Sequence, residues 1–404
     1  MKGFRDFLPA KMAIRNEVIK RLRGVFEKYG FEELQTPALE YQEVLLGKYG
    51  AEAEKLMYLF KDPGERNIGL KYDQTVPMAR VVSSYPDLPK PFKRYQIQPA
   101  WRAENPQKGR YREFYQCDVD TVGSYSPLAD AEIVAIINDS LKALEFTNYK
   151  IRINSRTVLF SIMDEANVPQ KKWLSAIQSV DKLDKKPPEE VENELDQKGL
   201  AKEQIKKIFN SIKKAKPDDF LSRVITYAKK LGVSERLVFD PTVSRGLDYY
   251  TGPIFESVVT EPKIGSVTGG GRYDQLLKTL GGPDLPATGT TIGLDRVCDV
   301  IEELKLWPNI KPTSTKVLVT IFSPDLLDQS IKIVKNLRDE NIKAELYPEE
   351  SAKLDKQLKY ADAKRIPFAV IIGPEEVAKN KIVLKNLKTK EQKKVSLSGL
   401  ISSI

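Results

Sequence analysis

Basic and aromatic side chains crowd one segment of the sequence, residues 90–112. It contains seven lysines and arginines and one acid, Glu104, so it carries a net charge of +6, and four aromatic side chains lie among the cations. Cations interleaved with aromatic rings suit a phosphate-rich ligand that also has a flat ring to stack. A solvated basic hairpin would have the same composition, and composition alone does not separate the two interpretations.

Acidic and amide side chains alternate along the segment that follows. Gln116, Asp118 and Asp120 are two residues apart, so on a β-strand all three point to one face. Acids on a half-buried face are costly unless they bind a cationic or hydrogen-bonding group. A small ligand with N–H groups, or a metal ion, would satisfy them, whereas a solvent-facing strand edge would need no ligand.

Glycine accompanies arginine, aspartate and tyrosine in two later segments. Residues 245–252 read RGLDYYTG and residues 269–274 read GGGRYD, and IGLDRV (292–297) opens a predicted helix. Successive glycines let a backbone approach a ligand closely, although they also permit tight packing. The chain has no GKS or GKT sequence and no GxGxxG between a strand and a helix, which argues against a P-loop and a Rossmann site.

The composition excludes several mechanisms. The chain has no histidine and two cysteines, Cys117 and Cys298. A His general base, a Ser-His-Asp or Cys-His nucleophile, an HExxH zinc site and a Cys₄ zinc site are therefore impossible. An enzyme made from this chain must use carboxylates, arginine, lysine, tyrosine and a metal held by oxygen ligands.

The net charge and the hydropathy of the chain indicate the kind of partner and the cellular compartment to expect. The net charge is +9, which favours a polyanionic partner. No run of apolar residues is long enough for a membrane span, and the first residues lack the apolar core of a signal peptide. Two cysteines cannot build a disulfide framework, so we expect a cytoplasmic protein.

Two strands joined by a loop would position the basic segment and the acids. Residues 92–102 and 110–120 are rich in aromatic and β-branched residues, and the loop sequence ENPQKG separates them. This pattern predicts a long antiparallel hairpin. Apolar residues at helical spacing over 11–29 predict an amphipathic helix that packs on the sheet.

Sequence patterns divide the rest of the chain into a helical insertion, a domain boundary and a C-terminal domain. Residues of about 166–236 are rich in lysine and have apolar residues at helical spacing, so we expect a helical unit inserted between two β-rich stretches. The sequence WPNIKPTST (307–315) has two prolines and small polar residues, which predicts a domain boundary. Beyond it, alternating strand and helix patterns indicate a small α/β domain of about 90 residues.

In order along the chain, several segments resemble the motifs of the histidyl-tRNA synthetase family of class II aminoacyl-tRNA synthetases. RGLDYYTG and the YDxT pattern separate this family from other class II synthetases, so the resemblance is specific, and it spans essentially the whole chain. The matching segments are GFRDFLP (3–9), LKYDQTVPMAR (70–80), WRAENPQKGRYREFYQCDVD (101–120), RGLDYYTG (245–252), GGGRYD (269–274) and TTIGLDRV (290–297).

The resemblance implies an α+β catalytic domain with an antiparallel sheet over residues 1–314, which includes the helical insertion at about 166–236. It implies a C-terminal α/β anticodon-binding domain over residues 315–404. The implied reaction joins L-histidine to tRNA(His) through histidyl-adenylate, with ATP as substrate and Mg²⁺ bridging phosphate oxygens. A homodimer is implied as well, with the segment FEELQTPALE (31–40) at its interface.

The resemblance also implies roles for individual residues. Arg102 and Arg245 match the family's two catalytic arginines, at the α-phosphate and between it and the histidine carboxylate. Asp120 matches the acid that reads the imidazole, where a carboxylate and a tyrosine hydroxyl can satisfy the donor and the acceptor nitrogen. The implied ATP-binding residues are Arg102, Glu104, Arg110, Phe114 and Arg296. The implied histidine-binding residues are Asp73, Thr75, Gln116, Asp120, Tyr249, Tyr250 and Tyr273, and Gln107 matches a residue near the acceptor end of the tRNA.

Two non-catalytic interpretations use the same fold. One is the paralogous regulatory subunit of ATP phosphoribosyltransferase, and the other is a sensor of uncharged tRNA. Such regulatory subunits usually lack the C-terminal domain and several site residues, whereas this chain keeps residues 315–404 and both Arg102 and Arg245. We therefore expect an enzyme.

Overall fold

The computed structural model describes residues 1–46, 54–107, 109–244, 249–262 and 264–404. They form two compact units, one of residues 1–5 and 17–307 and the other of residues 6–16 and 308–404. Within the described residues, we find no helix with the length and apolar character that a bilayer crossing requires.

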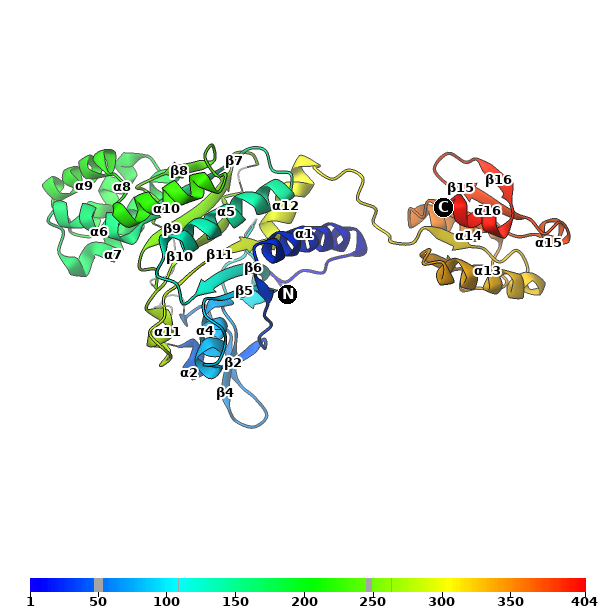
Figure 1. Cartoon of the computed structure of the whole chain (residues 1–404), viewed down its shortest axis with the longest axis horizontal. Coiled ribbons are helices and arrows are strands. Elements are labelled where there is room, and N and C mark those ends of the chain that lie inside the picture. Colours follow the sequence, from blue (N-terminus) through cyan, green and yellow to red (C-terminus); the bar gives the residue numbers. More distant parts are fainter. Residues whose placement is uncertain (47–53, 108, 245–248, 263) are drawn as a thin grey trace. The chain divides into compact units, whose positions relative to one another are not determined.

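An eight-stranded, mainly antiparallel sheet forms the centre of the first unit (Figure 1). Its middle six strands pair antiparallel, and the short edge strands β1 and β8 pair parallel to their neighbours. In spatial order the strands are β1 (Glu32–Glu33), β5 (Phe92–Trp101), β6 (Glu113–Val122), β11 (Ala287–Gly293), β10 (Ser266–Arg272), β9 (Pro253–Val259), β7 (Tyr149–Ser155) and β8 (Leu237–Phe239).

The predicted hairpin is confirmed as β5 and β6. The two strands pair from Phe92 opposite Val122 to Trp101 opposite Glu113. The second arm begins three residues later than predicted, because the connection is tightened by a bridge in which Gln107 and Arg110 exchange two backbone hydrogen bonds. This register places Arg94 directly opposite Asp120.

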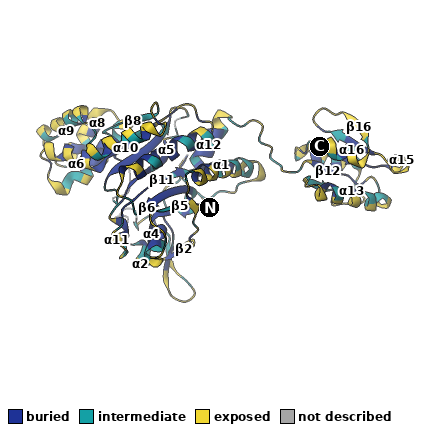
Figure 2. Cartoon of the chain, viewed as in Figure 1, coloured by how far each residue is buried: buried dark blue, intermediate teal, exposed yellow. Residues whose placement is uncertain are grey.

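Helices pack on the central sheet. The predicted N-terminal helix is α1 (Pro9–Lys28). Helix α5 (Pro127–Ala143) lies across one face of the sheet and contacts β11, and α10 (Asp219–Lys230) packs beside it (Figure 1). Helix α12 (Leu294–Leu304) follows β11 directly and contacts β6. Buried residues follow these strands and α5 (Figure 2).

A smaller three-stranded antiparallel sheet, ordered β2–β4–β3, lies in the same unit. It packs with two short helices and α4 around a buried apolar cluster. Its strands are β2 (Leu39–Tyr41), β4 (Asn67–Leu70) and β3 (Leu59–Lys61), and the helices are α2 (Gln42–Leu45), α4 (Thr75–Ser84) and α11 (Leu276–Thr279).

Helices fill the chain between β7 and β8, where the lysine-rich pattern predicts an insertion (Figure 1). The first of them begins ten residues before the predicted boundary, because the N-cap Ser155 accepts a hydrogen bond from the backbone of Thr157 and starts a helix at the end of β7. The helices are α6 (Arg156–Glu165), α7 (Trp173–Val180), α8 (Pro188–Gln197), α9 (Lys202–Lys214) and α10 (Asp219–Lys230).

The second unit has a mixed five-stranded sheet in the order β13–β12–β14–β15–β16. The three strands β13, β12 and β14 pair parallel, and the last two add antiparallel. The strands are β12 (Val317–Val319), β13 (Ala344–Leu346), β14 (Phe368–Ile371), β15 (Ile382–Asn386) and β16 (Gln392–Val395), with helices α13 (Leu327–Asp339), α14 (Leu354–Ala363), α15 (Pro374–Ala378) and α16 (Leu397–Ser402). This is the predicted α/β fold.

Candidate active site

A cavity of about 290 Å³ opens between the β5–β6 hairpin, β10 and the start of α12. All five residues that were predicted to bind ATP line it: Arg102, Glu104, Arg110, Phe114 and Arg296. They come from segments almost 200 residues apart, and the sheet order brings them together because β6 pairs with β11, which leads directly into α12.

A second cavity of about 170 Å³ adjoins the first. Both are lined by Arg102, Gln116, Gly269 and Thr291. The seven predicted histidine-binding residues all line this second cavity: Asp73, Thr75, Gln116, Asp120, Tyr249, Tyr250 and Tyr273. Arg245 lies outside the described residues. Gln107, at the hairpin tip, is not among the described residues that line either cavity.

Arg102 lies where the two cavities meet. Its backbone N–H donates to the carbonyl of Arg112 at 2.9 Å, and its Nε donates to the carbonyl of Tyr72 at 3.2 Å. Its guanidinium carbon lies 4.2 Å from the ring centre of Tyr72 and 5.0 Å from that of Phe114. The guanidinium is therefore fixed by its neighbours before any ligand binds.

The other arginines of the first cavity are held by backbone and carboxylate oxygens. Arg296 donates to the carbonyl of Gly109 at 2.8 Å and to that of Ser266 at 2.6 Å. Arg110 lies 3.6 Å from Glu104. Planar guanidinium groups that line one cavity match the oxygens of a polyphosphate.

The opening segment GFRDFLP supports the first cavity through Arg5, which contacts two of its lining residues, a role that the sequence did not reveal. Arg5 forms an ion pair of 2.5 Å with Asp295, and its guanidinium lies over the ring of Tyr111. The second oxygen of Asp295 accepts the backbone N–H of Tyr115 at 2.9 Å. Asp295 thus ties the N-terminal segment and the start of α12 to the return arm of the hairpin.

Three buried aspartates line the second cavity. Asp73 accepts the backbone N–H groups of Thr75 and Val76 at 2.9 and 3.1 Å, which anchors it at the first turn of α4. Asp118 and Asp120 project from β6 with 3% of their surface exposed. Burial raises the pKa of both carboxyl groups, that of Asp118 to about 7, because a charged group is poorly solvated there.

Three tyrosines line the second cavity together with the aspartates. The ring centres of Tyr249 and Tyr250 are 5.0 Å apart, and Tyr273 lies edge-on 5.7 Å from Tyr249. Burial raises the pKa of all three hydroxyls, so each stays neutral and can donate or accept a hydrogen bond. Tyr273 OH donates to Asp120 Oδ1.

The glycines of GGGRYD have different roles. A Cβ on Gly269 would meet nothing within 4 Å, and this residue lines both cavities, so it gives a ligand room. A Cβ on Gly270 would lie 2.2 Å from the carbonyl oxygen of Gly289 on β11, so this glycine serves strand packing. Gly289 itself makes room for Asp120, whose Oδ1 would be 1.9 Å from a Cβ there.

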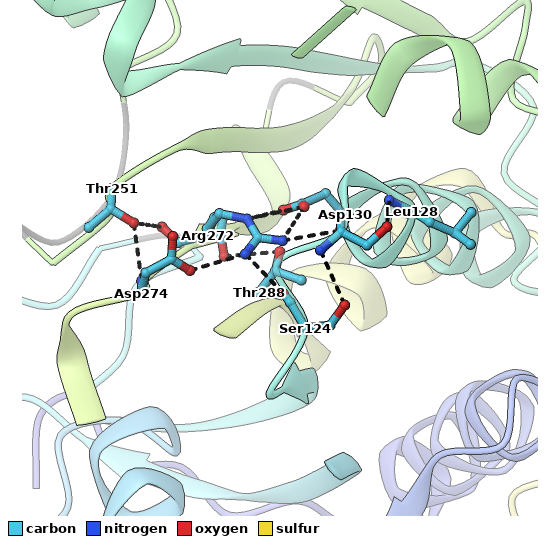
Figure 3. Close-up of polar contacts among 9 residues, drawn as sticks. Ser124, Leu128, Asp130, Thr251, Arg272, Asp274 and Thr288 are labelled. Carbon is cyan, nitrogen blue, oxygen red and sulfur yellow. Dashed lines mark hydrogen bonds and ion pairs between the residues drawn. The ribbon is translucent and has the colours of Figure 1, made fainter. Parts of the chain in front are cut away.

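A buried ion pair beside the second cavity was not predicted (Figure 3). Arg272 is 4% exposed and forms an ion pair with Asp130, which is fully buried at the start of α5. The distance between Arg272 Nη2 and Asp130 Oδ2 is 2.5 Å. Arg272 Nη1 also donates to the carbonyl of Ser124 and to Asp274, both at 3.1 Å. The backbone N–H of Thr251 donates to the carbonyl of Arg272 at 2.8 Å. Arg272 therefore anchors the residues that follow Tyr249 and Tyr250.

Comparisons with known proteins find similarity to histidyl-tRNA synthetases along nearly the whole chain. Residues 3–297 match the family described as histidyl-tRNA synthetase, and residues 316–404 match the anticodon binding domain. The chain is 39% identical to the histidine–tRNA ligase of Gloeobacter violaceus, over 98% of this chain and 96% of that one. It is 38% identical to the histidine–tRNA ligase of Aeropyrum pernix, over 100% and 97%.

Solved structures give the same result. The crystal structure of histidyl-tRNA synthetase from Nostoc sp. PCC 7120 matches with a TM-score of 0.84 and 32% identity, covering 99% of this chain and 97% of that one. An ATP phosphoribosyltransferase regulatory subunit/histidyl-tRNA synthetase from Bacillus halodurans shares the fold, with a TM-score of 0.75 at 20% identity. From its sequence, its fold and these relatives, the chain belongs to the histidyl-tRNA synthetase family.

Proposed function

We propose that this protein is a histidine–tRNA ligase, which forms histidyl-adenylate from L-histidine and ATP and then transfers the histidyl group to tRNA(His). The observation that carries the proposal is the pair of adjoining cavities. One gathers the residues predicted for ATP, the other gathers the described residues predicted for histidine, and Arg102 lies at their junction.

Adenylate formation is an in-line attack of the histidine carboxylate on the α-phosphorus of ATP, with pyrophosphate as the leaving group. It needs alignment and charge neutralisation more than proton transfer. Arg102 is fixed where the attacking carboxylate and the α-phosphate would meet. Arg245 remains the predicted second arginine. A chain without histidine loses nothing in this step.

ATP would lie in the larger cavity with its adenine against Phe114. Phe114 and Glu104 line this cavity with Arg102, so a ring and a hydrogen-bond acceptor are available to the base. Arg110 and Arg296 would take the distal phosphates. The described residues contain no group of three or more aspartate, glutamate or cysteine side chains that could hold a metal ion. We therefore expect Mg²⁺ to arrive on the ATP phosphates, where it neutralises their charge.

Histidine would lie in the smaller cavity with its ammonium group at Asp73 and its imidazole between Asp120 and the tyrosines. The imidazole has one N–H donor and one acceptor nitrogen, which a carboxylate and a tyrosine hydroxyl satisfy. An apolar amino acid of similar size would give the buried Asp120 no N–H donor in the cavity, and sites built to hydrogen-bond a ligand reject analogues that lack the group by about 10⁴–10⁵-fold.

The tRNA would engage the C-terminal domain, residues 315–404, which carry a net charge of +5. Its acceptor end would reach the catalytic domain, residues 1–314, near Gln107. Translation takes place in the cytoplasm, which is where we place the protein. The match of residues 316–404 to the anticodon binding domain supports the proposed role of the C-terminal domain in tRNA binding.

A homodimer would cover an exposed apolar face on the three-stranded sheet. Leu39, Tyr41 and Phe60 are 43%, 51% and 44% exposed. Ile68 pairs with both Tyr41 and Phe60, so these side chains share one face. Leu39 and Tyr41 lie at or next to the end of the segment 31–40, which supports its predicted place at the dimer interface.

The test is aminoacylation with labelled histidine, ATP, Mg²⁺ and a tRNA(His) transcript, with a transcript for another amino acid as control. We expect histidine to become attached to tRNA(His) alone. Tight binding of histidine and ATP without any charging would instead support one of the non-catalytic interpretations, which the full-length match to histidine–tRNA ligases does not favour.

A further inference from the structure

Arg94 belongs to the basic segment 90–112, but its burial fits neither phosphate binding nor a solvated hairpin surface. It lies on β5 and is 0% exposed, so no phosphate can reach it. Its Nη2 lies 2.9 Å from Asp120 Oδ2 on the neighbouring strand. A guanidinium buried against a carboxylate gives a large charge effect, because the surroundings are poorly solvating.

The position of Arg94 is fixed by further contacts. Its Nη1 donates to Gln96 Oε1 at 3.2 Å, and its Nη2 donates to the carbonyl of Gln74 at 3.3 Å. Gln96 in turn donates to Thr36 Oγ1 at 2.8 Å. The guanidinium is therefore held by the sheet and by the residue between Asp73 and α4, independently of any ligand.

Asp120 is also held on its other side. Its Oδ1 accepts the hydroxyl of Tyr273 and packs against the backbone of Gly289. With Arg94 at Oδ2, both oxygens of the predicted imidazole-reading carboxylate are oriented by the protein. The side chain presents one geometry to a ligand, which is the condition for precise recognition.

Arg94 supplies positive charge beside three buried acids of the cavity. Asp73, Asp118 and Asp120 are each 2–3% exposed. Arg94 is the cation that most strongly offsets the effect of burial on both Asp118 and Asp120. Among the described residues, the other titratable groups that face or border these acids include Arg102, Lys71, Tyr249, Tyr250 and Tyr273.

We propose that Arg94 is a positioning residue for histidine recognition, which holds Asp120 ionised and oriented so that it accepts the imidazole N–H. The inference rests on the proposed function. Without Arg94, Asp118 and Asp120 would share a proton, since two buried like charges cannot both ionise. A protonated carboxyl group donates where it should accept, so recognition would fail at neutral pH and return as the pH rises.

The experiment is histidine-dependent ATP–pyrophosphate exchange by the full-length protein between pH 6 and 8.5. We compare wild type with Arg94→Met, Arg94→Lys and Lys93→Met. Lys93 is the matched control, because it is the adjacent cation on β5 but pairs with Glu132 on α5. Titration of free histidine is common to all four proteins, so differences among them report on the enzyme.

For Arg94→Met at pH 7 we expect KM for histidine to rise about 10- to 100-fold, the loss expected when a buried charged contact to Asp120 is removed. KM for ATP should stay within about twofold. The pH midpoint of kcat/KM for histidine should move up by about one unit or more. Arg94→Lys should recover part of both effects, and Lys93→Met should behave as wild type.

A loss of activity that is equal at every pH, or a rise in both KM values together, would overturn the proposal and leave Arg94 a structural residue. If Arg94→Met does not fold, Arg94→Lys provides the test. A folded Arg94→Lys that has a raised KM for histidine but an unshifted pH midpoint of kcat/KM would contradict the inference. If wild type itself shows no exchange, the proposed function fails, and the inference fails with it.

Discussion

Replacing Asp118 by Asn should stabilise the ligand-free protein. Burial raises the pKa of this carboxyl group from 3.8 to about 7. Each unit of difference between folded and unfolded states corresponds to about 1.4 kcal/mol, so ionised Asp118 costs the folded state about 4 kcal/mol. Asn resembles the protonated side chain in shape and carries no charge, so the variant avoids this cost.

The sign of the effect fixes its pH dependence. Because the folded-state pKa is raised, the folded protein binds more protons than the unfolded chain between pH 3.8 and about 7, and Asp118 lowers stability as the pH rises through this window. The advantage of Asp118→Asn should grow from about 2 kcal/mol at pH 5.5 to about 4 kcal/mol at pH 8.

Tryptophan fluorescence in urea measures this change. All three tryptophans, Trp101, Trp173 and Trp307, belong to the unit that contains Asp118. The matched control is Asp87→Asn, at an exposed position in the same unit, which should not reproduce the gain in stability of Asp118→Asn. If the stability curves of wild type and Asp118→Asn run parallel from pH 5.5 to 8, the charge assignment in the smaller cavity is wrong.

Three further predictions concern the site and its support. Asp120→Ala should abolish histidine-dependent exchange while ATP binding, measured by calorimetry, persists; an unchanged KM for histidine would refute the imidazole role. Asp130→Asn should cost about 3 kcal/mol in urea unfolding, because the buried Arg272 loses its fully buried carboxylate partner and keeps the pair with the partly exposed Asp274, and a loss below about 1 kcal/mol would show that the pair does not anchor this region. Removing residues 315–404 should reduce tRNA charging more than adenylate formation, and an equal loss of both steps in a folded truncation would contradict the assigned domain roles.

Much of the fold could be predicted because its signals are local. The β5–β6 hairpin follows from residue type and a Pro-Gly loop, and the helical insertion follows from apolar spacing. The alternation of Gln116, Asp118 and Asp120 correctly placed these side chains on one face, and in the structure all three line the smaller cavity. Which segments would meet across the sheet came from the resemblance, because strand order is set by long-range pairing.

Other features could not be predicted, because they depend on register and distant contacts. Arg94 was counted among cations available to phosphate, whereas the register of the hairpin turns it onto Asp120. Arg272 and Asp130 are separated by 142 residues, and no local pattern connects them. The roles of Gly270 and Gly289 become visible only when the two strands are seen packed against each other.

The central claim is that the two cavities activate histidine with ATP. The most direct measurement is ATP–pyrophosphate exchange by the full-length protein with each of the twenty amino acids offered singly in the presence of Mg²⁺. Exchange with histidine alone is the predicted result. Exchange with a different amino acid, or none with any, would contradict the account.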